Sequence, residues 1–267
     1  SEALLAKATE GKEDEIYIAT KFCRQGDIAD PQNYSYETVK AYCEDSLKRL
    51  NRDSIDLFQI HCPATDILKD GSVFKVLDQL KEEGLIRHYG VSVESVEEGL
   101  ICLEYPNVAS LQIIFNMFRQ KPLEKLIPKA YQQGVGIIAR VPLASGLLTG
   151  KFTSETKFSE DNHRKFNENG ESFNVGETFS GLGLQKGVEL ANQLQWIAED
   201  RPSMASAALK WILDYKEISC INPGFRNIKQ VKQNLATLDT KAFTESEKLE
   251  IENFYKEKVA DFIRGTY

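Results

Sequence analysis

The sequence predicts an α/β protein of the (β/α)8 TIM barrel class, and three observations predict it. Short apolar runs recur along the chain, and an amphipathic stretch with helical spacing follows most of them. The 267 residues suffice for a single barrel domain over residues 1–267. No Gly-x-Gly-x-x-Gly motif follows any run, which disfavours the alternative of a doubly wound sheet.

Six of the apolar runs have the length and composition of buried strands. They cover residues 16–19, 55–60, 89–93, 111–115, 135–139 and 218–221. Strands that alternate with helices through short connections form a parallel sheet. The pattern therefore predicts six parallel strands.

The segments between the runs carry apolar residues three or four positions apart, as an amphipathic helix does. Such faces lie within residues 39–50, 73–80, 123–130 and 228–238. Gly84 and Gly134 follow two of them and can end those helices. Ser95 and Glu98 have the spacing of a capping box and predict the start of a further helix.

The start of the chain and the longest gap between the apolar runs allow two further predictions. A closed barrel of this class has eight strands, and residues 1–12 have a helical pattern. We therefore expect the first two strands, at about 30 residues for each βα unit, upstream of Ser1. Segment 151–183 is long, polar and rich in Gly, Asn, Ser and Glu, which predicts a loop over the active site.

Charge and composition disfavour several classes of partner. The formal net charge of -7 argues against nucleic acid and against anionic membrane surfaces. No apolar run approaches the roughly 18 residues of a membrane span, and the first residues lack a signal-peptide layout, which favours a cytoplasmic protein. The five cysteines have no metal-binding spacing, so we expect no metal.

Polar or turn-forming residues stand just past the predicted strands, where a barrel carries its active site. With them, five stretches in order resemble the aldo-keto reductases, specifically the bacterial branch similar to the potassium-channel beta subunits. The resemblance covers the whole chain, and each stretch alone is a weak signal. The stretches are Ile18-Ala19-Thr20-Lys21-Phe22, Asp56-Leu57-Phe58-Gln59-Ile60-His61, Gly90-Val91-Ser92, the run from Pro142 to Lys151, and Gly224-Phe225-Arg226 with Gln230 and Asn234.

The resemblance implies two catalytic residues in this chain. Lys21 would lie beside a catalytic tyrosine and lower its pKa, and His61 would position the substrate carbonyl. The tyrosine and an aspartate of the same mechanism are expected upstream of Ser1. Taken alone, Lys21 reads as a surface lysine and His61 as a core histidine.

The resemblance also implies that NADPH is the cofactor. Ser92 and Gln112 would bind the nicotinamide carboxamide, although Val93 stands where many relatives have asparagine, and Gln112 alone would read as a buried amide. Arg140 would stack on the nicotinamide ring. The residues implied near the pyrophosphate are Pro142, Leu143, Ser145, Gly146, Leu148 and Lys151.

The last cofactor residues follow the final predicted strand. Gly224 precedes Arg226, which would bind the 2'-phosphate of NADPH, and Gln230 and Asn234 would contact the adenosine. Gln230 has a rival interpretation as the capping partner of Asn227. Likewise, Gly146 and the glycine at position 150 could simply shape a loop.

These residues together predict an NADPH-dependent oxidoreductase that reduces aldehydes or ketones to alcohols by hydride transfer. Two alternatives stay open: a non-catalytic nicotinamide-binding sensor or regulatory subunit, and an inactive truncated reductase. The small carbonyl substrate is not identified by the sequence, because loops choose it. Five phenylalanines in and near the long loop could line a substrate pocket or, as we favour, anchor the loop; they are Phe152, Phe158, Phe166, Phe173 and Phe179.

Overall fold

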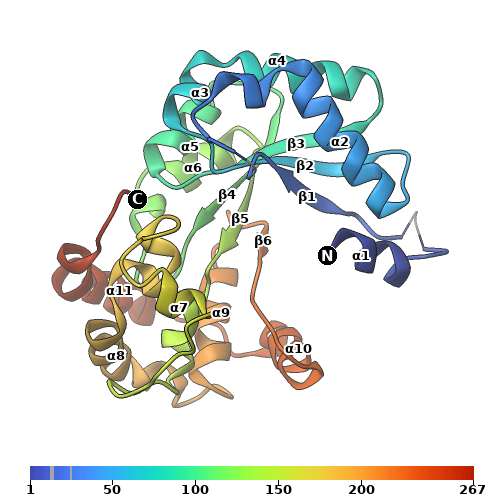
Figure 1. Cartoon of the computed structure of the whole chain (residues 1–267). Helices are drawn as coiled ribbons and strands as arrows, with labels where there is room; N and C mark the ends of the chain where they lie inside the picture. Colours follow the sequence, from blue (N-terminus) through green and yellow to red (C-terminus); the bar gives the residue numbers. More distant parts are fainter. Residues whose placement is uncertain (13–14, 25) are drawn as a thin grey trace. The chain divides into compact units, whose positions relative to one another are not determined.

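A computed structural model describes residues 1–12, 15–24 and 26–267 of the chain (Figure 1). Six strands follow one another in the sheet in chain order. They are β1 (Ala19–Phe22), β2 (Ile55–His61), β3 (Ile86–Ser92), β4 (Val108–Ile114), β5 (Gly136–Arg140) and β6 (Cys220–Ile221). The pairs β1–β2, β2–β3, β3–β4 and β5–β6 are parallel. The predicted parallel strands are thus confirmed in number, while two further strands upstream of Ser1 stay a prediction.

The first strand begins later than its apolar run indicates. The run at residues 16–19 predicts a strand there, but β1 covers Ala19–Phe22. Ladder pairing with β2 starts at Ala19 opposite Leu57, and Tyr17 is 82% exposed. Phe22 is buried instead and stacks on Phe58 with ring centroids 4.5 Å apart. Cross-strand packing, rather than the local apolar run, sets the position of this strand.

The chain divides into two compact units, and each is described by itself. Unit 1 comprises Ser1–Gln112 with Gln132–Val135, and unit 2 comprises Ile113–Tyr131 with Gly136–Tyr267. The helices of unit 1 are α1 (Glu2–Ala8), α2 (Tyr36–Leu50), α3 (Thr65–Asp70), α4 (Ser72–Glu82) and α5 (Val96–Cys102). None of the helices in the described ranges of the whole chain is long and apolar enough to cross a membrane.

The strands of unit 1 have one apolar and one polar face. Phe58 pairs with Tyr89, and Ile60 pairs with Val91, and all four side chains are buried. Each buried aliphatic or aromatic side chain contributes about 1.5–3 kcal/mol. Polar residues occupy the alternate positions, because successive strand residues point to opposite faces. The polar set is Lys21, Gln59, His61, Ser92, Ser110 and Gln112.

The helices begin and end where the sequence signals indicate. Helix α5 has the predicted capping box, since Ser95 Oγ accepts from Glu98 N and Glu98 Oε2 accepts from Ser95 N. Helix α4 ends at Glu82, and Gly84 follows in the left-handed conformation at φ 78°. Ser35 caps α2, and Asn51 ends that helix at φ 53°. These local contacts satisfy backbone groups that a helix terminus leaves unpaired.

Unit 2 packs its helices around an aromatic core. Trp211 is fully buried and stacks on Phe115 at 5.2 Å, and Tyr215 meets both rings edge-on. Segment 151–183 contains the single-turn helix α7 (His163–Phe166) and two 3-10 turns, at Val175–Glu177 and Phe179–Gly181. The other helices are α6 (Leu126–Gln132), α8 (Leu184–Gln193), α9 (Met204–Leu213), α10 (Ile228–Leu235) and α11 (Glu245–Phe254), and a π-helical turn (Tyr255–Val259) continues α11.

Candidate active site and cofactor cavity

Four predicted site residues of unit 1 lie on the polar face of the sheet. His61 pairs with Ser92, and Ser92 pairs with Gln112, so these three stand side by side. His61 and Ser92 end β2 and β3, and Gln112 lies two residues before the end of β4. Lys21 pairs with Gln59, two residues before His61 on the same face of β2. The register therefore groups Lys21, His61, Ser92 and Gln112.

The backbone turns sharply directly after two of these strands. Cys23 and Cys62 have φ values of 69° and 52°, a left-handed conformation that costs a non-glycine residue free energy. Cys62 N donates to Ser92 O at 2.9 Å, and Cys62 Sγ lies 3.5 Å from Ser92 Oγ. Ser92 and Gln112 are almost fully buried. Strained residues of this kind cluster at functional sites, which agrees with the position of this group at the strand ends.

Unit 2 contains a cavity of about 570 Å³ that includes seven of the predicted cofactor residues. Those seven are Pro142, Leu143, Ser145, Gly146, Gly224, Arg226 and Gln230. The other lining residues are Val141, Thr149, His163, Arg164, Phe173, Glu177, Asn222 and Phe225. The tertiary structure thus brings the loop after β5 together with the loop after β6, more than 70 residues apart in the chain.

The loop after β5 is held in a strained, left-handed path. Val141, Ala144, Ser145 and Gly146 have φ values of 52°, 49°, 56° and 105°. A Cβ atom at Gly146 would lie 2.9 Å from the Phe152 ring, so only glycine is tolerated there. Within the loop, Ala144 N donates to Val141 O at 3.0 Å and Gly146 N donates to Leu143 O at 2.8 Å, so these two N–H groups stabilise the turn itself.

Asn116 fixes this loop from the core. Its side chain is fully buried, and its Nδ2 donates to Val141 O at 2.9 Å and to Ser180 Oγ at 3.0 Å. Its Oδ1 accepts from Phe118 N at 2.9 Å. A buried amide with every group paired can hold a strained backbone because breaking any of these bonds leaves an unpaired polar group.

The long segment 151–183 is tied to the same loop through Ser145. Arg164 Nε donates to Ser145 O at 2.5 Å. Ser145 Oγ donates to Glu177 O at 2.7 Å and accepts from Phe179 N at 3.0 Å. Among the five phenylalanines, Phe152, Phe158 and Phe179 form a mutual cluster and Phe166 meets Phe173 edge-on, which favours the anchoring interpretation. Phe173 also lines the cavity.

The cavity carries concentrated positive charge. Burial lowers the pKa of His163, and the charges of Arg164 and Arg226 lower it further. Burial and Arg226 likewise lower the pKa of the Arg164 guanidinium. Burial is the largest cause of both shifts, and the neighbouring arginines add a smaller repulsion, which an anion between them would relieve. The residues present therefore suit a phosphate-bearing ligand such as NADPH.

Six predicted cofactor residues do not line the cavity: Ser92 and Gln112 belong to unit 1, and the other four lie in unit 2. The Arg140 guanidinium forms an ion pair with Glu177, and both side chains are largely buried. Leu148 is buried in the core, and Lys151 is exposed. Asn234 lies near the cavity wall, where its Nδ2 donates to Gly224 O at 3.4 Å.

Gln230 takes part in the cap of α10, as its interpretation as the capping partner of Asn227 predicts, but its side chain bonds to a different backbone N–H. Asn227 Oδ1 accepts from Gln230 N at 3.0 Å, which caps α10. The Gln230 side chain reaches back, and its Oε1 accepts from Arg226 N at 2.6 Å. Gln230 therefore shapes the turn that presents Arg226 while it also lines the cavity. The glycine at position 150 ends a 3-10 turn at φ 68°, so the loop interpretation holds for it.

The sequence patterns do not mark Arg164, His163 or Glu177 as site residues, although all three line the cavity. They lie in the segment assigned only as a long loop, and no motif marks them. One signal was present: a His-Arg-Lys run follows Asn162 inside a polar, acidic stretch, and Asn162 Oδ1 caps the short helix by accepting from Arg164 N.

The chain is similar to known proteins in sequence and in fold. The model of the "Aldo/keto reductase family" matches residues 1–256. The chain is 31% identical over 257 residues to the aldo-keto reductase str7 of Strobilurus tenacellus, covering 92% of this chain and 71% of that protein. It is 24% identical over 265 residues to an uncharacterized oxidoreductase, YqkF, of Bacillus subtilis, covering 97% of this chain and 80% of that protein.

Two solved structures illustrate the fold. The glycerol dehydrogenase AKR11B4 from Gluconobacter oxydans superposes with a TM-score of 0.73 at 26% identity, over 100% of this chain and 80% of that one. An aldo/keto reductase from Klebsiella pneumoniae in complex with NADP and acetate superposes with a TM-score of 0.65 at 20% identity, over 95% of this chain and 75% of that one. The family match over residues 1–256 leads to one conclusion: the chain belongs to the aldo/keto reductase family.

Proposed function

We propose that this protein binds NADPH and reduces a small aldehyde or ketone to the alcohol. The observation that carries the proposal is the cationic cavity of unit 2, where Arg164, Arg226 and His163 face the left-handed loop after β5. The oxidoreductase class is that of the family, and the Klebsiella pneumoniae reductase with this fold is a complex with NADP.

The phosphate groups would be bound by the cavity residues. Arg226 would pair with the 2'-phosphate, and Arg164 with the pyrophosphate near Ser145 and Gly146. A guanidinium presents several N–H donors in a fixed plane, which suits phosphate oxygens better than a single ammonium does. The loop 151–183, tied to Ser145 by Arg164 and Glu177, would cover the bound phosphates.

The polar face of unit 1 carries the residues for which the resemblance implies roles at the reacting end of the cofactor. Bound NADPH would supply the hydride. Ser92 and Gln112 would hold the carboxamide by hydrogen bonds, and the buried position of both side chains fixes their direction. His61 would donate a hydrogen bond to the carbonyl oxygen and orient it, and Lys21 would favour the ionised form of a neighbouring proton donor. The tyrosine that the resemblance implies for that role stays a prediction.

The phosphate assignment is tested by comparing NADPH with NADH. We expect Arg226→Ala to weaken NADPH binding about 10- to 100-fold, as one charged hydrogen-bond pair contributes about 1.5–3 kcal/mol, and to change NADH binding little. Quenching of protein fluorescence during titration measures both constants. Lys229→Ala is the matched control, because Lys229 is an exposed cation on α10 that does not line the cavity.

Two results would contradict the proposal. Equal weakening of NADPH and NADH would exclude a 2'-phosphate role for Arg226. Tight NADPH binding without oxidation of the cofactor across a panel of aldehydes and ketones would favour the non-catalytic sensor instead.

A further inference from the structure

The segment Ile263–Tyr267, called the latch below, follows α11 and its helical turns within unit 2 (Figure 1). Its Arg264 side chain contacts two places that are far apart in the preceding sequence. Arg264 Nη2 donates to Glu168 O at 3.1 Å, and Nη1 donates to Asn169 Oδ1 at 3.0 Å. Arg264 Nε donates to Gly181 O at 3.0 Å, and the Arg264 backbone N donates to the same oxygen at 3.3 Å. One arginine thus holds together the two ends of the loop between Glu168 and Gly181.

The latch also packs closely on this loop at two glycines. A Cβ atom at Gly181 would lie 2.7 Å from Arg264 O, and a Cβ atom at Gly265 would lie 2.7 Å from Val175 Cγ1. Both glycines have positive φ values, 84° and 79°. Glycine accepts such a conformation and leaves room for the neighbouring chain. The contact between latch and loop therefore depends on shape as well as on hydrogen bonds.

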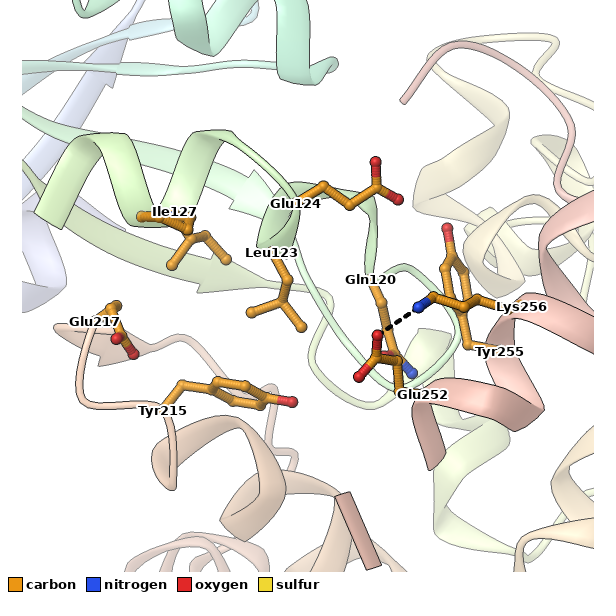
Figure 2. Close-up of a pocket in the computed structure, with 10 residues that line it drawn as sticks. Gln120, Leu123, Glu124, Ile127, Tyr215, Glu217, Glu252, Tyr255 and Lys256 are labelled. Carbon is orange, nitrogen blue, oxygen red and sulfur yellow. Dashed lines mark hydrogen bonds and ion pairs between the residues drawn. The ribbon is translucent and has the colours of Figure 1, made fainter. Parts of the chain in front are cut away.

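The far end of the latch is anchored outside that loop. The Arg119 guanidinium lies over the Tyr267 ring at 4.4 Å, and Arg119 Nη2 donates to Thr266 O at 2.9 Å. Lys121 Nζ donates to Tyr267 O at 2.8 Å, and the Tyr255 and Tyr267 hydroxyls lie 2.7 Å apart. Figure 2 shows Tyr255, which lines a pocket of about 340 Å³ together with residues of α6 and α11. None of these anchoring residues is among those that line the cofactor cavity.

Loop 168–181 also belongs to the cofactor cavity. Phe173 and Glu177 lie in this loop and line the cavity. Phe179 N donates to Ser145 Oγ at 3.0 Å, and Ser145 Oγ donates to Glu177 O at 2.7 Å. One loop thus contacts both the latch and the strained turn after β5.

We propose that the latch is coupled to the cofactor, with Arg264 and Tyr267 as positioning residues for NADPH. This rests on the proposed function, because NADPH is the ligand expected against loop 168–181. The bonds of Arg264 hold the loop in the conformation that lines the cavity, so ligand binding has to order fewer residues. Coupling between two sites is reciprocal, so bound NADPH stabilises the latch to the same extent. Loss of either anchor of the latch should therefore speed the release of NADPH.

Amide hydrogen exchange of the whole protein tests the contact between latch and loop without any cofactor. Tyr267→Ala removes the ring and the hydroxyl that anchor the latch, and it changes no residue of loop 168–181. We expect the Phe179 amide, which is bonded to Ser145 Oγ, to exchange about tenfold faster, because the loop opens more often once the latch is released.

Arg264→Ala should have an effect of similar size, since it releases the same latch from the loop. The double variant should exchange little faster than either single variant, because the coupled contacts are lost together. Lys258→Ala is the matched control, since Lys258 is an exposed cation on the π-helical turn, outside the latch. An unchanged Phe179 amide in Tyr267→Ala, or equal acceleration by Lys258→Ala, overturns the proposal.

Stopped-flow fluorescence then measures the release of NADPH from the same variants. Release should be about tenfold faster in Tyr267→Ala and in Arg264→Ala than in the wild type and in Lys258→Ala. Bound NADPH should also slow exchange of the wild-type Arg264 amide, which is bonded to Gly181 O. Unchanged release rates in variants that still fold, as checked by thermal unfolding, overturn the proposed coupling. A wild-type protein that binds no NADPH would instead contradict the proposed function.

Discussion

At the scale of single residues, the side chains on the polar face of unit 1 divide into groups with separable roles. Lys21 and His61 are proposed to act on the reacting carbonyl, whereas Ser92 and Gln112 are proposed to hold the cofactor. Lys21→Met and His61→Gln should therefore each lower kcat about 10²- to 10⁴-fold, the range for loss of acid–base assistance. The dissociation constant of NADPH should stay within about twofold, because neither residue is assigned to the phosphates. Steady-state kinetics and fluorescence titration on the same variants separate the two effects, and a parallel loss in both would make the residues cofactor ligands instead.

The pH behaviour of His163 follows from its surroundings. Burial, Arg164 and Arg226 lower its pKa in the folded protein below the ordinary value near 6.5. The unfolded chain therefore binds the proton first as the pH falls through 6.5, and the folded state loses stability below that pH. A bound phosphate should reverse the shift, because a nearby anion favours the charged imidazolium.

This reversal is measurable by following the His163 ring protons by NMR between pH 5 and pH 8. NADPH should raise the midpoint of their titration, and NADPH should bind more tightly at pH 6 than at pH 7.5. Arg164→Gln should also raise the midpoint in the free protein, because it removes one of the two repelling charges. A midpoint that NADPH leaves unchanged would place the phosphates away from His163.

At the scale of elements, the loop after β5 depends on a contact outside its own sequence. Asn116→Ala removes both donors that hold Val141 O and Ser180 Oγ, and leaves Phe118 N without its acceptor. We expect a loss of about 2–4 kcal/mol in the free energy of unfolding, in line with a disrupted buried hydrogen-bond group, together with weaker NADPH binding. Denaturant unfolding and cofactor titration measure the two effects.

A helix cap in unit 1 provides the contrasting case. Ser95→Ala removes the cap of α5 and should cost about 1 kcal/mol of stability. NADPH binding should be unaffected, since no phosphate-binding residue is assigned to that helix. If both variants changed NADPH affinity alike, the effect of Asn116→Ala would be a general loss of stability rather than a loss of loop geometry.

At the scale of the whole molecule, a local positive cavity stands in a chain of net charge -7. Long-range repulsion should keep extended polyanions away, whereas a small anion can enter the cavity, where the local charge is positive. NADPH at a hundredfold excess over its dissociation constant should stabilise the protein by about 2.7 kcal/mol, seen as a higher Tm. Duplex DNA at the same phosphate concentration should leave the Tm unchanged. This holds at about 0.15 M salt, where the Debye length is about 8 Å. An increase in Tm with DNA would indicate a basic surface patch that the net charge of the chain does not reveal.

The sequence by itself determined the local elements and the family. The strands β2 to β6, the helix caps at Ser95 and Asn227, and the strand-end residues Lys21, His61, Ser92 and Gln112 follow from patterns that span fewer than ten residues each. Periodicity and capping are short-range physics, so they can be read along the chain. The strand bounds could not all be read in this way. Strands β3 and β4 each begin three residues before their apolar runs. Strand β1 begins only at Ala19, because pairing with β2 and burial of Phe22 outweighed the local run of Ile16, Tyr17 and Ile18.

Only the tertiary structure decided how the phosphate cavity is built. Arg164 and Glu177 lie in a loop without a motif. Arg164 contacts Ser145, 19 residues earlier in the chain, and Glu177 contacts Arg140, 37 residues earlier. The strained path of Val141 depends on Asn116, and the orientation of the buried Gln120 amide depends on Ile251 of α11, 131 residues away. Electrostatic repulsion, backbone strain and unpaired buried groups arise only when distant segments of the chain come into contact. No local sequence pattern can therefore predict them.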